Sequence, residues 1–304
     1  MHTSSPPAVI VIGSINTDMV IKTTALPVPG QTVMGGKFFM SPGGKGGNQA
    51  VAAARHGAQV KMIANVGQDM FGDESIQRLQ EEGIDCSLIG RDFIQPSGIA
   101  LISVNEAGEN QIVVAPGAND TLSAAHIDEA IQQIPDFSVV LMQLEIPLET
   151  VVHAVMRVAA KNCRVILDPA PAQHLPDALL AAIYLITPNE TEAEQLTGIT
   201  IDSEAAARAA ALSLLARGVH NVALTLGANG VLLANANTQE IIPAPQVVAV
   251  DSTAAGDCFN GSLAAALARG YELRKAVRFG CRSAAISVTR LGAQDSMPLA
   301  HELG

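Results

Sequence analysis

Short apolar runs alternate with amphipathic stretches along most of the chain. The first run, Val9–Gly13, reads VIVIG and stops at a glycine, as a buried strand does. The further strands expected from such runs are Val60–Val66, Val139–Gln143, Arg164–Asp168, Ile183–Thr187 and Val222–Leu226. The amphipathic stretches predict helices over Asn48–His56, Asp73–Glu82, Ala124–Gln133, Leu148–Lys161, Glu190–Leu196, Glu204–Arg217, Gly256–Arg269 and Leu273–Thr289. Strand-then-helix alternation predicts an α/β fold, an open and mostly parallel sheet in an α/β/α sandwich.

Two segments interrupt this alternation. Residues 18–41 carry Pro27, Pro29 and Gly30 between β-prone stretches, and residues 97–116 contain two alternating strands around a turn. We expect them to form a small β lid outside the main α/β unit of residues 8–17, 42–96 and 117–304. Such a sheet could cover the carboxyl ends of the main strands, or offer an edge for pairing with a second copy in a homodimer.

Composition narrows the class of protein. The chain has 304 residues, of which 48% are hydrophobic and 3% aromatic, with a net charge of −11. An acidic surface argues against binding of nucleic acid or an anionic membrane, yet backbone amides and a metal can still hold phosphates. The four cysteines form no CxxC pair, the seven histidines no zinc motif, and Met1–Pro7 no targeting pattern. A soluble, cytoplasmic protein is expected.

The stretch DSTAAGDCFNG, from Asp251 to Gly261, carries the strongest chemical signal. A strand is expected to arrive through Val247–Val250, and small residues then lead into an apolar helix. Free amides at a helix start attract phosphate, and Gly256 would allow close approach. Asp257 could then take a proton from an attacking hydroxyl. The alternative is that Asp257 only caps the helix, and the sequence does not decide between them.

A second stretch, PGGKGGNQ from Pro42 to Gln49, has four glycines around one lysine. Glycines let a backbone lie against a ligand, while Lys45 and Asn48 offer donors to hydroxyls. It is not a Walker A loop, and no GxGxxG follows the first strand, which disfavours a dinucleotide-dependent dehydrogenase. A flexible loop before a helix is the structural alternative.

Polar residues also follow several other predicted strands. Asn16 and Asp18 follow the first strand, and Glu145 follows Val139–Gln143, where ligands gather in open α/β sheets. Asn189 and Glu192 could hold a hydrated Mg²⁺, although a capping box explains their spacing better. The run Thr225–Gly230 fits a nucleotide-binding turn or an ordinary hairpin turn.

In order and spacing, these motifs resemble the ribokinase-like carbohydrate kinase family over about Val9 to Pro298. The resemblance is carried by GSINTD (13–18), GGKGGNQA (43–50), MQLE (142–145), NETE (189–192), DSTAAGD (251–257) and TRLGAQ (289–294). It implies an ATP-dependent kinase for the 5-hydroxyl of a small sugar, with ribose as the first candidate. This chain departs from the family's pattern at two positions. It has Cys258 where threonine is common, and Cys281 where the family often has a histidine beside adenine.

The resemblance also implies roles for individual residues. Asp257 would be the general base, and the amides of Ala254, Ala255, Gly256 and Asp257 would form an anion hole. The sugar would contact Asn16, Asp18, Gly44, Lys45, Gly46, Gly47, Asn48, Glu145 and Asp257. ATP would contact Asn189, Thr225, Leu226, Gly227, Ala228, Asn229, Gly230, Gly256 and Cys281, with Glu192 positioning Mg²⁺ through water. K⁺ would be bound by Asp251, Thr253, Ser287, Arg290, Gly292 and Ser296.

Two rival functions remain open at this point. One is a kinase of the same fold that acts on deoxyribose, fructose or a related sugar. The other is a sugar- or nucleotide-binding protein that has lost catalysis, against which Asn189, Gly256 and Asp257 argue.

Overall fold

The computed structural model describes residues 8–303 of the chain, so the expectation for Met1–Pro7 lies outside the described residues. A nine-stranded sheet forms the centre of the molecule, with the strand order β13-β12-β11-β10-β9-β8-β1-β4-β5. All pairs from β11 to β5 are parallel, and only β12 and β13 run antiparallel to their neighbours. The strands are β1 (Val9–Ile12), β4 (Val60–Gly67), β5 (Asp85–Asp92), β8 (Val139–Met142), β9 (Arg164–Leu167), β10 (Leu185–Ile186), β11 (Asn221–Thr225), β12 (Val231–Asn235) and β13 (Gln239–Ile242).

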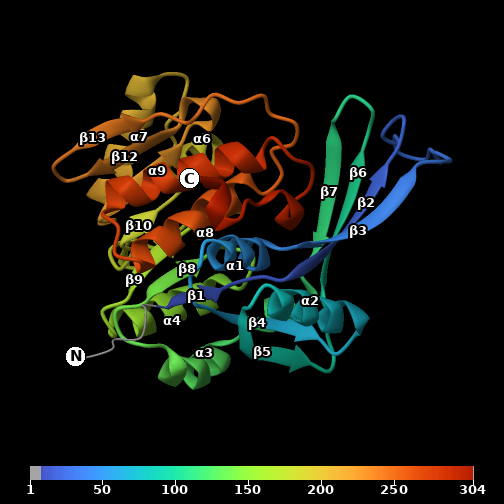
Figure 1. The fold of residues 1–304 in the computed structure, drawn as a ribbon, viewed down its shortest axis with the longest axis horizontal. Coiled ribbons are helices and arrows are strands. Elements are labelled where there is room, and N and C mark those ends of the chain that lie inside the picture. The colour runs from blue at the N-terminus through green and yellow to red at the C-terminus, as the bar shows by residue number, and fades with distance from the viewer. Residues whose placement is uncertain (1–7, 304) are drawn as a thin grey trace.

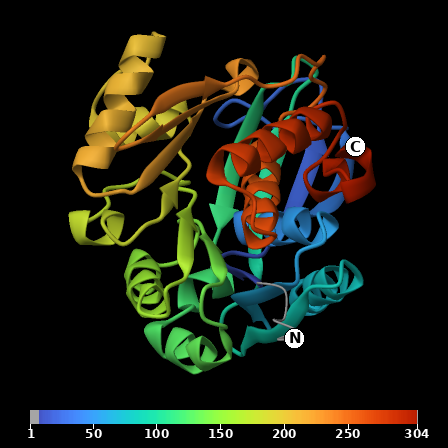
Figure 2. The same ribbon diagram turned by 60° about the vertical axis from the view of Figure 1, so that its left-hand side comes forward.

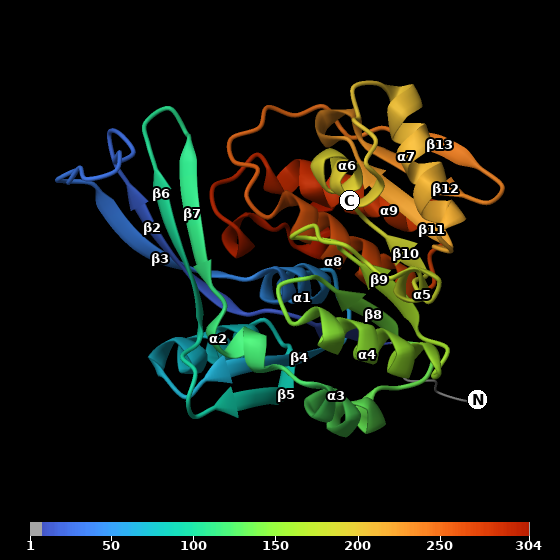
Figure 3. The same ribbon diagram turned by 180° about the vertical axis from the view of Figure 1, so that it is seen from behind.

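Helices cover both faces of this sheet, because successive strand residues point to opposite sides. Val9 and Val11 pack into one core and Ile10 and Ile12 into the other. The helices are α1 (Lys45–Arg55), α2 (Met70–Glu81), α3 (Ala124–Ala130), α4 (Leu148–Ala159), α5 (Asp177–Leu180), α6 (Glu190–Thr197), α7 (Glu204–Ala216), α8 (Ala255–Ala268) and α9 (Leu273–Ser287). Helices α1, α8 and α9 lie on the near face in Figure 1, and α3 and α4 on the other face, seen in Figure 3.

A second sheet of four strands stands beside the main one, in the order β3-β2-β6-β7. Its strands are β2 (Asn16–Lys22), β3 (Lys37–Gly43), β6 (Gly98–Val104) and β7 (Asn110–Ala115). Two antiparallel hairpins are joined by the parallel pair β2–β6. The predicted fold class, an α/β/α sandwich with a small β lid, is confirmed. Strands β2 and β3 extend two residues beyond the two ends of the predicted segment 18–41, to Asn16 and to Gly43.

Several expectations about elements were wrong, and some strands were not expected at all; helix α2, for example, begins at Met70 rather than Asp73. Val247–Val250 forms no strand: it has no regular secondary structure, Val248 is 84% exposed, and no strand within residues 8–303 pairs with it. Helix α1 begins at Lys45 rather than Asn48, so that two glycines lie in its first turn. The edge strands β5 and β13 and the penultimate strand β12 were not expected. Figure 2 shows α6 and α7 (yellow) at one end of the main sheet and α2 (teal) at the other.

None of the helices within residues 8–303 has the length and apolar character needed to cross a bilayer.

Candidate active site

The start of helix α8 meets the glycine-rich start of helix α1. Asn48 Nδ2 donates to Asp257 Oδ2 at 2.9 Å, and Gln49 Nε2 donates to Asp257 Oδ1 at 2.9 Å. The capping alternative for Asp257 was wrong, because the N-cap of α8 is Ala254 and the Asp257 carboxylate points into the protein, 6% exposed. Residues 209 positions apart therefore form one polar centre between the two helices.

The backbone at the start of α8 offers unused amides. Ala254 adopts a left-handed conformation with φ 56°, an unusual geometry for a residue with a side chain. Within residues 8–303, the amides of Ala254, Gly256 and Asp257 have no hydrogen-bond acceptor, whereas the Ala255 amide donates to Ser252 O at 3.2 Å. A Cβ on Gly256 would meet no atom of another segment within 4 Å, so a ligand could approach the chain closely at this residue. Such a helix start fits an anionic phosphoryl group.

The predicted sugar residues converge on the same place. Asp18 lies on β2, Lys45 opens α1, and Glu145 follows β8. Glu145 Oε2 accepts from Ser14 Oγ at 2.5 Å and from the Lys45 amide at 2.9 Å, which places a carboxylate at the start of α1. Asn16 Oδ1 accepts from Asn119 Nδ2 at 2.7 Å.

Two charged side chains in this cluster lack partners. Within residues 8–303, the Asp18 carboxylate accepts no hydrogen bond and the Lys45 ammonium forms no ion pair. Burial raises the pKa of Asp18 to about 6, and Glu145 and Asp257 add to the rise. Burial lowers the pKa of Lys45, but Asp257, Asp168, Glu145 and Glu192 together raise it above its ordinary value. Unpaired acceptors and donors of this kind suit a ligand that carries several hydroxyl groups.

The glycines of the Gly43–Gly47 run serve chain packing as well. Gly44 has φ 82° and a Cβ there would lie 2.6 Å from the Asn16 backbone nitrogen. A Cβ on Gly43 would lie 2.2 Å from an Asp18 carboxylate oxygen. The glycines that were expected to admit a ligand therefore also admit β2 itself, which brings Asp18 against the start of α1.

Sequence reasoning missed Asp168, which follows β9 directly. Its Oδ2 accepts from Gln49 Nε2 at 2.7 Å, and its side chain is 5% exposed in the structure. Burial raises the pKa of Asp168 to about 8; Lys45 and the Gln49 hydrogen bond oppose the rise, while Asp257 and Glu192 add to it. A carboxylate at the end of a buried strand was the signal that drew attention to Glu145, and it applied equally to Asp168.

The predicted nucleotide residues divide into two groups. Asn189 pairs with Thr225 as an isolated parallel bridge, so the starts of α6 and of the Thr225–Gly230 turn lie side by side. The capping box is confirmed: Glu192 N donates to Asn189 Oδ1 at 2.8 Å, and Asn189 N donates to Glu192 Oε2 at 2.9 Å. The 225–230 run also forms the ordinary hairpin turn between β11 and β12. Cys281 lies in the core, 5% exposed, and burial raises its pKa to about 12.

Some of the residues expected to bind a monovalent cation meet at one loop junction. Asp251 Oδ1 accepts from Thr253 Oγ1 at 2.6 Å, and Asp251 Oδ2 accepts from the Gly292 amide at 2.9 Å. The Ser287 carbonyl accepts from the Arg290 amide at 3.0 Å. The Arg290 side chain instead points to Glu302, and the Ser296 hydroxyl donates to Ala293 O. No cluster of three His, Cys, Asp or Glu side chains suited to a metal occurs within residues 8–303. Backbone carbonyls would have to supply most ligands.

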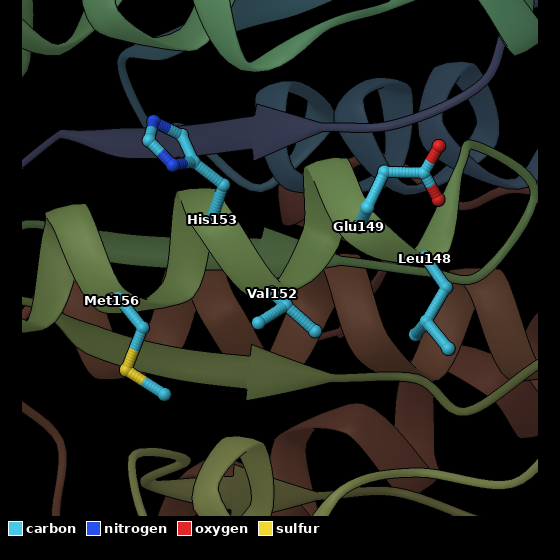
Figure 4. Close-up of a pocket in the computed structure, with 5 residues that line it drawn as sticks. All are labelled: Leu148, Glu149, Val152, His153 and Met156. Atoms are coloured by element: carbon cyan, nitrogen blue, oxygen red, sulfur yellow. The ribbon is translucent and has the colours of Figure 1, made fainter.

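A separate, shallow hollow lies elsewhere on the described surface. It measures about 600 Å³ and runs along α4 (Figure 4), lined by Leu148, Glu149, Val152, His153 and Met156. Helix α4 packs on the opposite face of the sheet from α1 and α8, so this hollow is not part of the Asp257 centre.

Comparison with known proteins agrees with this geometry. The family model described as pfkB family carbohydrate kinase matches residues 7–300. The chain is 44% identical to the ribokinase of Haemophilus influenzae over 96% of its own length and 95% of that protein. It is 37% identical to the deoxyribokinase of Salmonella typhimurium over 95% of each. The structure of Arabidopsis thaliana ribokinase complexed with ribose and ATP is 27% identical, with a TM-score of 0.90 and 98% of both chains covered. The chain belongs to the pfkB family of carbohydrate kinases.

Proposed function

We propose that this protein transfers the γ-phosphoryl group of ATP to the 5-hydroxyl of D-ribose, giving ribose 5-phosphate and ADP. One observation carries the proposal: the Asp257 carboxylate meets the Lys45–Asn48 start of α1, with Asn48 Nδ2 at 2.9 Å, beside the free amides of Gly256 and Asp257. A base and an anion site are thus next to Asp18 and Lys45, two charged side chains that have no partner in the part of the chain that the structure describes. A sugar kinase needs these three parts together.

The proposed reaction places most of the work on alignment and charge. Asp257 accepts the proton of the sugar hydroxyl while the hydroxyl oxygen bonds to the γ-phosphorus and the bond to the ADP oxygen breaks. The amides of Gly256 and Asp257 would hold the non-bridging oxygens of the transferred group. Asp18, Asn16, Lys45 and Glu145 would hold the remaining hydroxyls.

The residues at the ends of β10 and β11 fit the nucleotide side. Asn189 and the turn Thr225–Gly230 lie together, and would contact ATP. Both Glu192 oxygens already accept hydrogen bonds from Asn189, which fits a role toward Mg²⁺ through water better than direct coordination. Cys281 exposes too little surface in this structure to stack broadly on a base. A cytoplasmic location fits the four free cysteines.

Deoxyribose is the rival sugar, since a deoxyribokinase lies among the relatives. An assay of ADP release over a panel of pentoses and hexoses separates the possibilities. We expect kcat/KM for ribose to exceed that for deoxyribose and fructose, because a site built to bind a hydroxyl leaves polar groups unpaired when it is missing. A preference for deoxyribose would overturn the sugar assignment. Sugar binding without any ADP release would identify a catalytically silent protein.

Replacing K⁺ by Na⁺ should lower the rate of ADP release. Asp251 ties the segment before α8 to Gly292, so a cation bound there would hold the Ala254–Asp257 turn in place. The assay should compare chloride salts at equal ionic strength, with Asp251→Asn as the matched variant. We expect that variant to be slow in either salt. Equal rates of the unaltered protein in K⁺ and Na⁺ would contradict the cation site.

A homodimer through the small sheet is also proposed. Its edge strands β3 and β7 carry exposed apolar side chains, among them Phe38 at 60% and Val113 at 67% exposure. Exposed apolar side chains on edge strands favour association with a second copy. We expect Val113→Asp to give a monomer in sedimentation analysis. Met156→Asp, which places the same charge at an exposed residue of α4, should leave the mass of the dimer unchanged. A monomeric unaltered protein would contradict the proposal.

A further inference from the structure

The side-chain amide of Gln49 is the hub of the buried polar centre. Gln49 lies on α1 with no exposed surface. Its Nε2 donates to Asp257 Oδ1 at 2.9 Å and to Asp168 Oδ2 at 2.7 Å, and its Oε1 accepts from Gln143 Nε2 at 2.6 Å. Both amide protons are used. This one group therefore connects α1, α8 and the ends of two neighbouring strands, β8 and β9.

Only one orientation of the Gln49 amide satisfies its neighbours. Reversed, its oxygen would face the acceptor oxygens of Asp257 and Asp168, and its nitrogen would face the Gln143 amide nitrogen. Gln143 is fully buried, and it supplies the donor that selects the observed orientation. Gln143 Oε1 lies against the chain just after β1, since a Cβ on Gly13 would come within 2.0 Å of it.

These contacts determine how the Asp257 carboxylate is held. Each of its oxygens accepts one amide donor, Gln49 on Oδ1 and Asn48 on Oδ2. Asn48 is held by Gln294 Nε2, which donates to Asn48 Oδ1 at 3.1 Å. Two donors from adjacent residues of one helix fix both the position and the plane of the carboxylate. Transfer of a proton during phosphoryl transfer depends on such alignment.

We propose that Gln49 is a positioning residue that aims the Asp257 carboxylate at the sugar hydroxyl, and that Gln143 acts through Gln49 by fixing the orientation of its amide. The inference rests on the proposed kinase function. It assigns a role in turnover to two glutamines that touch neither the sugar nor ATP in the proposed arrangement.

The first test is Gln49→Met, which keeps the length of the side chain and removes its donors. We expect kcat to fall about 10- to 100-fold while KM for sugar and for ATP changes less than about threefold, because alignment is lost and binding groups remain. The matched control is Thr150→Val, which removes one buried hydrogen bond, from Thr150 Oγ1 to Leu122 O at 2.6 Å, on the other face of the sheet. It should lower the melting temperature and leave kcat unchanged.

The second test is a double-mutant cycle with Gln143→Met. Alone, this change should lower kcat less than Gln49→Met does. In the Gln49→Met background it should cause no further fall, because the group through which Gln143 acts is gone. Multiplicative effects would overturn the link between the two glutamines. Normal kcat in Gln49→Met, or equal losses in kcat and in sugar binding, would overturn the positioning role.

The two proposals fail differently. Absence of ADP release by the unaltered protein with every sugar in the panel would overturn the kinase assignment and, with it, this inference. An active unaltered protein together with a fully active Gln49→Met variant would overturn the positioning role alone.

Discussion

Replacing Asp257 by asparagine should lower kcat about 10²- to 10⁴-fold, the usual cost of removing a positioned base. Asparagine keeps the shape of the side chain but cannot accept the hydroxyl proton. We expect KM for sugar and ATP to stay within about threefold, because the Asp18 cluster and the α8 amides remain. Steady-state ADP release, with sugar binding measured by calorimetry, separates the two effects.

This variant should also be slightly less stable. Asn48 and Gln49 both donate to Asp257, so the new amide nitrogen must face one of these donors. We expect a loss of about 1–3 kcal/mol in unfolding free energy, the usual cost of an unmade buried hydrogen bond. A folded variant that turns over within tenfold of the unaltered protein would refute Asp257 as the base.

Asp18→Asn should weaken sugar binding and stabilise the fold at the same time. The folded-state pKa of about 6 lies above the ordinary value of 3.8 for an aspartate, so ionised Asp18 costs stability, and this cost increases as the pH rises through that interval. Removing the charge should return about 1–2 kcal/mol at neutral pH, a rise of roughly 2–5 °C in melting temperature. KM for the sugar should rise on the order of 100-fold, since charge-assisted hydrogen bonds to two hydroxyls are weakened.

The control for this pair of effects is Asp85→Asn. Asp85 forms an ion pair with Lys61 at 3.0 Å. Burial raises the pKa of Asp85, but hydrogen bonds from Ser87 and Lys61 outweigh it and hold the pKa below its ordinary value. Its removal should lower stability and leave sugar KM unchanged.

The Asp18 pKa adds a pH test: KM of the unaltered protein should rise as pH falls below about 6, where protonation removes an acceptor. Unchanged sugar KM in Asp18→Asn would contradict the assignment of Asp18 to the sugar.

Much of the fold could be predicted because strands buried on both faces are read as continuous apolar runs. Val9–Ile12 and Val139–Met142 are of this kind, and both lie at the centre of the sheet. Edge strands lack the pattern: β5 carries Asp85 and Arg91 among its apolar residues and was missed. Val247–Val250 shows the reverse error, because three valines in four residues make no strand without a neighbour to pair with.

The site divides in the same way. A carboxylate after a strand is visible in sequence, which explains why Asp18 and Glu145 were found and why Asp168 could have been. The groups that the Asp257 carboxylate faces, Asn48 and Gln49, lie more than 200 residues away, and no local pattern contains that information. Buried glutamines carry no signature either. A role for Gln49 and Gln143 can be inferred only from the atoms to which they are hydrogen-bonded.

Strand β2 belongs to the small sheet along its whole length, from Asn16 to Lys22. Asn16 and Asp18 therefore belong to the same hydrogen-bonded ladder as the exposed Ile21, near the other end of the strand. Any tilt of the small sheet relative to the start of α1 would therefore move Asp18 as well. A neighbouring molecule or a crowded solution that pushes on the far end of the small sheet would then change the affinity of the Asp18 cluster for its ligand.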